Sequence, residues 1–143
     1  MKKVIVTGGA GFIGSALIRH LISNTDNSVL NIDKLTYAGN LESLTSVSES
    51  KRYTFRKVDI IDRVELEKIF EEFEPDIVFH LAAESHVDNS ITDPLGFVDT
   101  NILGTAVLLN SCKKLWSQYS GDKKKNFRFQ HISTDEVFGS ASK

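Results

Sequence analysis

The chain has one cysteine, two prolines and no charge excess that would favour a polyanionic partner. Because Cys112 has no second cysteine to pair with, an internal disulfide is excluded, and a reducing compartment, the cytoplasm, is expected. The formal net charge of −2 gives no electrostatic reason to expect nucleic acid as a partner. The concentrated basic run, Lys123-Lys124-Lys125, stands in a polar stretch and is expected to form a solvated loop.

Long apolar runs and metal-ligand clusters are also missing. No apolar stretch approaches the ~20 residues of a membrane span, so no membrane partner is expected. Met1-Lys2-Lys3 leads directly into an expected strand, without the apolar core of a signal peptide. The four histidines lack metal-ligand spacing with Cys112, and a zinc site would need about four convergent donors, so no metal is expected.

The composition is that of an ordinary globular protein, with 41% hydrophobic and 25% charged residues. Short runs rich in β-branched and aromatic residues alternate with helical patterns, which predicts a parallel sheet with helices on both faces. The expected strands lie near 3–7, 28–32, 53–58, 77–81 and 127–132, and the expected helices near 12–23, from 62 to a break at Pro75, and over 95–116. We therefore expect one α/β domain over residues 1–143, a Rossmann-type doubly wound parallel sheet.

The first expected strand runs straight into a glycine-rich turn. Gly8, Gly11 and Gly14 fit the pattern G-x-x-G-x-x-G. Gly9, Gly11 and Gly14 fit the pattern G-x-G-x-x-G. Glycines at this spacing let backbone N–H groups approach a pyrophosphate, which then rests at the positive amino-terminus of the next helix. A strand before the turn and an apolar helical pattern after it strengthen the prediction of a dinucleotide site.

Asp33 closes the second expected strand, about twenty residues after the glycines. At that distance a carboxylate can accept a hydrogen bond from a ribose hydroxyl, and it would repel the 2′-phosphate of NADP. The neighbouring Lys34 would soften that repulsion. The sequence thus predicts NAD rather than NADP.

The fifth expected strand ends in Thr134, Asp135 and Glu136. In open α/β sheets ligands bind outside the carboxyl ends of the strands, so a hydroxyl and two carboxylates there are placed for chemistry. One of two neighbouring carboxyls can act as a general acid and the other as a general base if their environments give them different pKa values. The alternative is a turn in which Asp135 and Glu136 cap a following helix.

Several segments together resemble the extended short-chain dehydrogenase/reductases, and within them the dTDP-glucose 4,6-dehydratase family. The matching segments are 7–14, 33–41, 59–60, 80–88, 101–105 and 131–139. The first segment and Leu81-Ala82-Ala83 mark the superfamily only, whereas the runs 33–40 and 133–137 are specific to the nucleotide-sugar dehydratases. Asn89 and Phe138 depart from the family's usual residues, and neither belongs to the expected acid and base.

The resemblance implies a role for each matching residue. Gly8, Gly11, Phe12, Ile13 and Gly14 would lie along the pyrophosphate, Asp33, Lys34, Leu35 and Thr36 around the adenosine ribose, Asp59 and Ile60 around the adenine, and Leu81, Ala82, Ala83, Glu84, Ser85 and Thr100 along the rest of NAD. Ser85 and Thr134 would also face the sugar. Asp135 would be the general acid and Glu136 the general base. The implied reaction converts dTDP-glucose to dTDP-4-dehydro-6-deoxyglucose with loss of water, in a homodimer that uses the helix over 95–116.

The superfamily's Tyr-x-x-x-Lys pair is missing from its expected place after Glu136. Tyr53 and Lys57 have the spacing but lie in an expected strand, where residues four apart are over ~13 Å apart. Tyr119 and Lys123 flank a glycine in a polar stretch, so we reject both pairs. We expect the amino-terminal part of a longer enzyme, without the substrate-binding portion, that binds NAD but does not turn over alone. A related epimerase or reductase, and a non-catalytic NAD-binding module, stay open as alternatives.

Overall fold

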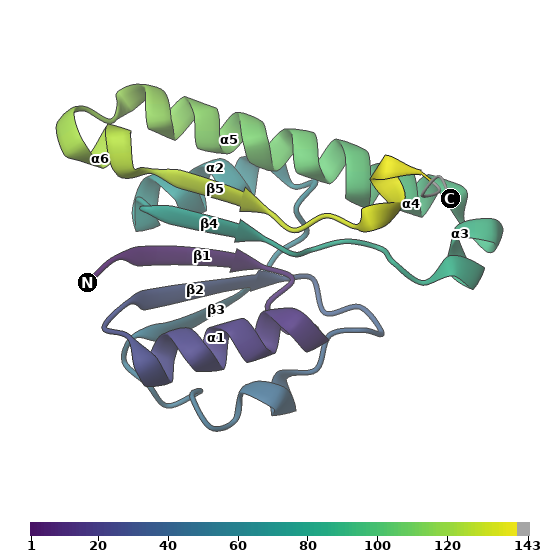
Figure 1. The fold of residues 1–143 in the computed structure, drawn as a ribbon, viewed down its shortest axis with the longest axis horizontal. Coiled ribbons are helices and arrows are strands. Elements are labelled where there is room, and N and C mark those ends of the chain that lie inside the picture. Colours follow the sequence, from purple (N-terminus) through teal and green to yellow (C-terminus); the bar gives the residue numbers. More distant parts are fainter. Residues whose placement is uncertain (140–143) are drawn as a thin grey trace.

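The computed structural model describes residues 1–139, without the side chains of Val87, Asp135 and Glu136. A five-stranded parallel sheet forms its centre, and all the strand arrows in Figure 1 point the same way. The strands are β1 (Lys3–Thr7), β2 (Ser28–Asp33), β3 (Tyr53–Lys57), β4 (Ile77–His80) and β5 (Arg128–His131). Their spatial order is β3-β2-β1-β4-β5, with β1 between β2 and β4. The predicted parallel α/β sheet is confirmed.

A helical segment follows every strand, and in two places the structure contradicts the prediction. They are α1 (Phe12–Asn24), η1 (Leu41–Leu44), α2 (Arg63–Phe73), α3 (Val87–Thr92), α4 (Pro94–Phe97), η2 (Val98–Gly104), α5 (Thr105–Gln118), α6 (Gly121–Asn126) and η3 (Asp135–Phe138). The helix expected over 95–116 contains a π-helical stretch, η2, between α4 and α5. The lysine run expected in a loop forms α6 instead, because Lys123 and Lys124 stack over the rings of Tyr119 and Trp116.

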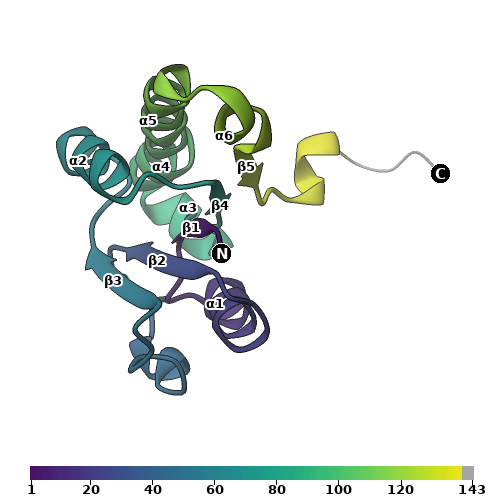
Figure 2. The same cartoon turned by 90° about the vertical axis from the view of Figure 1, so that its left-hand side faces the viewer.

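Helices cover both faces of the sheet, so the apolar core has two halves. Figure 2 shows α1 on one side of the strands and α2 with α5 on the other. On the α1 side, Val4 and Val6 of β1 pack with Ile18 of α1. On the opposite side, Ile5 packs with Phe70 of α2. Consecutive residues of β1 therefore face opposite halves of the core, as the period of a strand requires.

Local signals explain where α2 begins and ends. The Asp62 side chain accepts a hydrogen bond from the Glu65 backbone N–H at 3.1 Å, as expected of a capping residue. Glu74 adopts a left-handed conformation with φ of 48°, and Pro75 follows it. No side chain caps α1, which begins after Gly11 at the glycine-rich turn. The amino-terminus of α1 thus lacks the side-chain partner that a helix of this length usually has.

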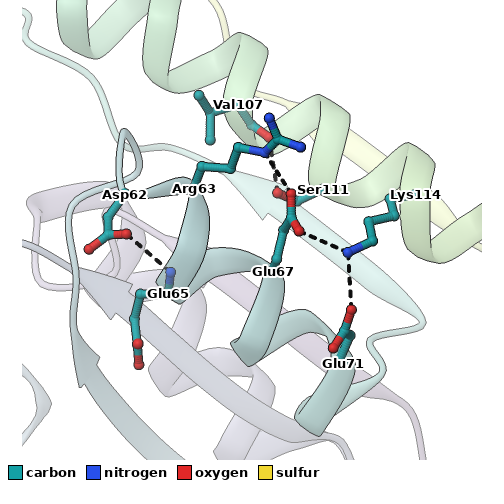
Figure 3. Close-up of polar contacts among 8 residues, drawn as sticks. All are labelled: Asp62, Arg63, Glu65, Glu67, Glu71, Val107, Ser111 and Lys114. Atoms are coloured by element: carbon teal, nitrogen blue, oxygen red, sulfur yellow. Dashed lines mark hydrogen bonds and ion pairs between the residues drawn. The ribbon is translucent and has the colours of Figure 1, made fainter.

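Charged side chains join α2 to α5 at the surface (Figure 3). Glu67 contacts Arg63 at 2.7 Å and Lys114 at 2.8 Å, and Lys114 also reaches Glu71 at 3.2 Å. Hydrogen bonds from Lys114 and then Arg63 lower the pKa of Glu67, and those to Glu67 and then Glu71 raise the pKa of Lys114. Arg63, Glu71 and Lys114 are exposed and Glu67 is partly exposed, so these pairs orient α5 against α2 more than they stabilise the fold.

The helical stretch Pro94–Gln118 corrects the expectation that no segment reaches the length of a membrane span. By length and composition alone, this one stretch of the described residues could cross a membrane. In the fold, its α5 part carries Leu108, Cys112 and Leu115 into the core beside α2. Several of its other apolar side chains are exposed, Ile102 and Leu103 among them.

Cys112 is expected to be almost unreactive in the folded chain. Its side chain is 4% exposed, and burial raises the pKa of its thiol to about 12 from 9.0. At a pH below both values, the reactive thiolate is then roughly a thousandfold scarcer in the folded state than in the unfolded state. Alkylation with iodoacetamide, timed with and without denaturant, measures this difference. Equal rates in the two states would show that Cys112 is accessible.

Candidate dinucleotide-binding site

A cavity of about 350 Å³ lies at the carboxyl ends of the strands. It is lined by Gly8, Gly11, Phe12, Ile13, Gly14, Ile32, Asp33, Lys34, Thr36, Ala38, Gly39, Val58, Asp59, Ile60, Leu81, Ala82, Ala83, Glu84, Ser85, Thr100 and Ile132. The chain leaves β1 toward β2 on one side and returns to β4 on the other, so the strand order reverses here. Open α/β sheets bind their ligands at such a switch point.

The glycine-rich turn packs so closely that side chains would not fit in it. Gly8 has a φ of 69°, and a Cβ there would lie 2.6 Å from the backbone nitrogen of Ala82. A Cβ on Gly14 would lie 2.2 Å from the carbonyl oxygen of Gly8. Gly8 also donates its N–H to the Ile32 carbonyl at 2.9 Å, which ties the turn to the end of β2. The turn therefore presents bare backbone to the cavity, beside the amino-terminus of α1.

The Asp33 carboxylate is fixed by two backbone N–H groups. Its Oδ2 accepts from Ala10 at 2.9 Å and its Oδ1 from Leu35 at 2.8 Å. Leu35 has a φ of 57°, a left-handed conformation that is uncommon for leucine and that turns the chain back over Asp33. A carboxylate has about four acceptor positions, so Asp33 can still accept hydrogen bonds from a ligand in the cavity.

Lys34 reaches from the end of β2 to two other walls of the cavity. Its Nζ lies 3.4 Å from the Asp59 carboxylate and 3.3 Å from the Thr100 hydroxyl. Both partners of the ion pair are about one-third exposed. Because Asp59 neutralises part of the lysine's charge, Lys34 is less able to attract a 2′-phosphate than a free lysine would be.

His80 forms a buried hydrogen-bond network beneath the cavity that the sequence did not predict. Its Nδ1 lies 2.7 Å from the Thr7 hydroxyl and its Nε2 3.0 Å from that of Thr105. Thr7 also accepts from the N–H of Ala82, which lines the cavity. Burial, and secondarily the nearby His131, lowers the pKa of His80 from 6.5 to about 4. A neutral ring thus joins β1, β4 and α5.

The cavity brings together all the expected cofactor residues except Leu35, whose backbone N–H instead positions Asp33. The sequence analysis missed further lining residues, Ile32, Ala38, Gly39, Val58 and Ile132, which continue the stretches that it did name. As contacts to a cofactor, all of these residues stay predictions. In the part of the chain that the structure describes, no group of His, Cys, Asp and Glu is placed to hold a metal ion.

The expected catalytic residues follow β5 at the same edge of the sheet. Thr134 is exposed and, in residues 1–139, does not belong to the described lining of the cavity. The backbone of Asp135 and Glu136 begins the 3₁₀ turn η3. Their side chains lie outside what the structure describes, so the roles of acid and base stay predictions.

A family model for GDP-mannose 4,6-dehydratase matches residues 5–143. The chain belongs to this family. A similar relative is the dTDP-glucose 4,6-dehydratase of Salmonella typhimurium, which is 63% identical over 96% of this chain and 38% of the relative. The dTDP-glucose 4,6-dehydratase of Neisseria meningitidis is 58% identical over 97% of this chain and 39% of the relative. This chain spans about two fifths of the length of these relatives.

Solved structures show the same relationship. The dTDP-glucose 4,6-dehydratase DesIV of Streptomyces venezuelae, with NAD bound, matches with a TM-score of 0.84 at 38% identity, over 99% of this chain and 42% of that protein. The enzyme from Bacillus anthracis, in complex with NAD, matches with a TM-score of 0.82 at 33% identity, over 100% of this chain and 41% of its own. These matches confirm the resemblance that the sequence motifs indicated.

Proposed function

We propose that this chain is the NAD-binding amino-terminal part of a dTDP-glucose 4,6-dehydratase. The observation that carries the proposal is the 56–63% identity to curated proteins of that name over nearly the whole chain. The cavity at the switch point of the sheet supports it, because family members with this fold hold NAD. The parent enzyme would convert dTDP-glucose to dTDP-4-dehydro-6-deoxyglucose and water.

The cavity's residues fit NAD. The turn at Gly8 and Gly14 offers a cradle that any Cβ would fill, as close backbone approach to a pyrophosphate requires. Asp33 is held in place with acceptor capacity left for the ribose hydroxyls. Asp59 and Ile60 would face the adenine, and bound NAD would supply a reversible hydride acceptor. The chain's own residues then have to bind, orient and move protons.

Proton transfer would fall to the two carboxyls after β5. Glu136 would take the proton from C5 of the sugar, which a ketone at C4 makes acidic, and Asp135 would protonate the C6 hydroxyl so that it leaves as water. Ser85 and Thr134 would hold the sugar. This division of labour requires Asp135 to keep its proton near neutral pH while Glu136 is ionised.

Three measurements test the proposal. Calorimetric titration of the chain with NAD is expected to show one site per chain, and incubation with NAD and dTDP-glucose is expected to leave the sugar unchanged by mass spectrometry. The longer protein that contains this chain is expected to remove one water from dTDP-glucose. Epimerised sugar without water loss would identify an epimerase, and no reaction with NAD bound would favour a non-catalytic module.

Asp33→Asn is expected to weaken NAD binding by about tenfold, because a neutral amide loses a charge-assisted hydrogen bond to the ribose. The same change is expected to narrow the gap between NAD and NADP, because it removes the repulsion of the 2′-phosphate. Parallel titrations of the unaltered chain and of Asp33→Asn, each with NAD and with NADP, measure both effects. Equal preference of the unaltered chain for NAD and NADP would contradict the role of Asp33.

The proposal extends to a cytoplasmic homodimer. The single cysteine is buried and unpaired, as in proteins of reducing compartments. Ile102 and Leu103 of η2 and Leu109 and Trp116 of α5 are apolar and exposed, which supports a second copy packing on this helix. Sedimentation of the longer protein tests it: a monomer would contradict the dimer.

A further inference from the structure

A tyrosine and a glutamate join two loops that leave the sheet on opposite sides of β1. The Tyr37 hydroxyl, in the loop after β2, donates a hydrogen bond to Oε2 of Glu84, in the loop after β4, at 3.3 Å. Thr36 and Ala38, on either side of Tyr37, line the cavity, as does Glu84 itself. Since β1 lies between β2 and β4, this bond connects the two walls of the cavity across the glycine-rich turn.

The glutamate end of this connection is held firmly. Asn101 of η2 accepts from the backbone N–H of Glu84 at 2.9 Å and donates to its carbonyl at 2.9 Å. The backbone at Glu84 therefore stays in place whatever its side chain does. The loop after β2 is anchored as well, because Asn40 donates its N–H to the Ala10 carbonyl at 2.9 Å.

The Tyr37 side chain itself contributes little to the core. It is 65% exposed, and its ring meets the edge of the His86 ring, with centroids 6.3 Å apart and an angle of 81°. A large aromatic side chain that is mostly in solvent can swing away without disturbing the packing of the sheet. The hydrogen bond from Tyr37 to a carboxylate on the opposite wall therefore has a role other than stabilising the fold.

We propose that Tyr37 and Glu84 form a latch that closes over bound NAD and slows its release. The inference rests on the proposed NAD binding. Because both loop backbones are anchored, the latch opens when the Tyr37 side chain swings away from Glu84, and the hydrogen bond that must break first adds to the barrier for dissociation of a dinucleotide beneath it. Slow release suits a reaction in which NAD is reduced and reoxidised within one turnover. If the reduced cofactor were lost, the enzyme could not complete that turnover.

The test measures how fast NADH, bound to the chain, is displaced by excess NAD, followed by NADH fluorescence. Tyr37→Phe keeps the ring and removes the hydroxyl, and is expected to speed release about threefold to tenfold, the net effect of a typical hydrogen bond, because this one is long and exposed to solvent. Tyr119→Phe is the matched control. It also loses a hydroxyl hydrogen bond, to the Pro75 carbonyl at 3.0 Å, but at the other end of the strands, so release is expected to be unchanged.

A double-mutant cycle separates the latch from other effects of Glu84, which lines the cavity. In a Glu84→Ala background, Tyr37→Phe is expected to have no further effect on release. An additive effect there, or an unchanged rate in Tyr37→Phe, would overturn the latch and leave the proposed function standing. Failure of the unaltered chain to bind NADH at all would overturn both the latch and the proposed function.

Discussion

Gly14→Ala is expected to abolish NAD binding, with at least a ~100-fold loss of affinity, or ~2.8 kcal/mol. The added Cβ would lie 2.2 Å from the Gly8 carbonyl oxygen and 2.8 Å from the Gly9 Cα, both backbone atoms, so the turn must move. Overpacking of this kind costs typically 1–3 kcal/mol in stability as well. A displaced turn no longer aims its N–H groups at the pyrophosphate. Calorimetric titration with NAD and thermal unfolding measure both effects.

Gly121→Ala is the control for this substitution. Gly121 has a φ of 56°, but a Cβ there would meet no atom within 4 Å. Only the left-handed backbone is strained by alanine, at a cost of about 1 kcal/mol, and NAD affinity is expected to stay the same. If Gly14→Ala bound NAD within threefold of the unaltered chain, the glycine-rich turn would not be the pyrophosphate site.

Acid is expected to destabilise the chain through His80. In the folded state its pKa is lowered to about 4, whereas 6.5 is its ordinary value, so the unfolded chain binds the proton more tightly. The free energy of unfolding is therefore highest above pH 6.5 and falls as the pH drops toward 4, by roughly 3 kcal/mol from this group. The ring is 1% exposed, so solvent screens little of this effect. Urea unfolding at a series of pH values measures the decline.

His80→Gln isolates the contribution of the histidine. Glutamine has an amide that can donate and accept but does not titrate, so the variant is expected to be less stable at pH 7 and to lose less stability between pH 6.5 and pH 4. The carboxylates of the chain titrate in both proteins and cancel in the comparison. An equal decline in both proteins would show that His80 is not the group that responds to acid.

The strands and the cofactor cavity could be predicted because their signals are local. Buried β-branched runs such as Val4-Ile5-Val6 fixed the positions of strands, and β1, β2 and β3 lie within one residue of the expected bounds. Gly8, Gly14 and Asp33 follow strands directly, and parallel strands gather their carboxyl ends at one edge. The family resemblance added the residues at 59–60 and 81–85, which spacing alone would not have selected.

Features that depend on contacts between distant segments could not be predicted. His80 stood in an expected strand, but its partners Thr7 and Thr105 come from β1 and α5. The charge pattern predicted a loop for the lysine run, which instead forms α6. The backbone carbonyl of Lys124 there accepts a hydrogen bond from the Trp116 indole at 3.1 Å, a contact that charge alone does not predict. The bond between Tyr37 and Glu84 joins loops that no periodic pattern relates.

The central position of β1 also sets the order in which the chain can fold. β1 can pair with β2 once residues 28–32 exist, but its other edge waits for residues 77–80 of β4. Closing the longer loop costs more chain entropy, so the unit of β1, α1 and β2 is expected to form first and β4 later. During synthesis on the ribosome, β1 therefore exposes an unpaired strand edge until β4 emerges, and in this interval the edge can pair with another chain.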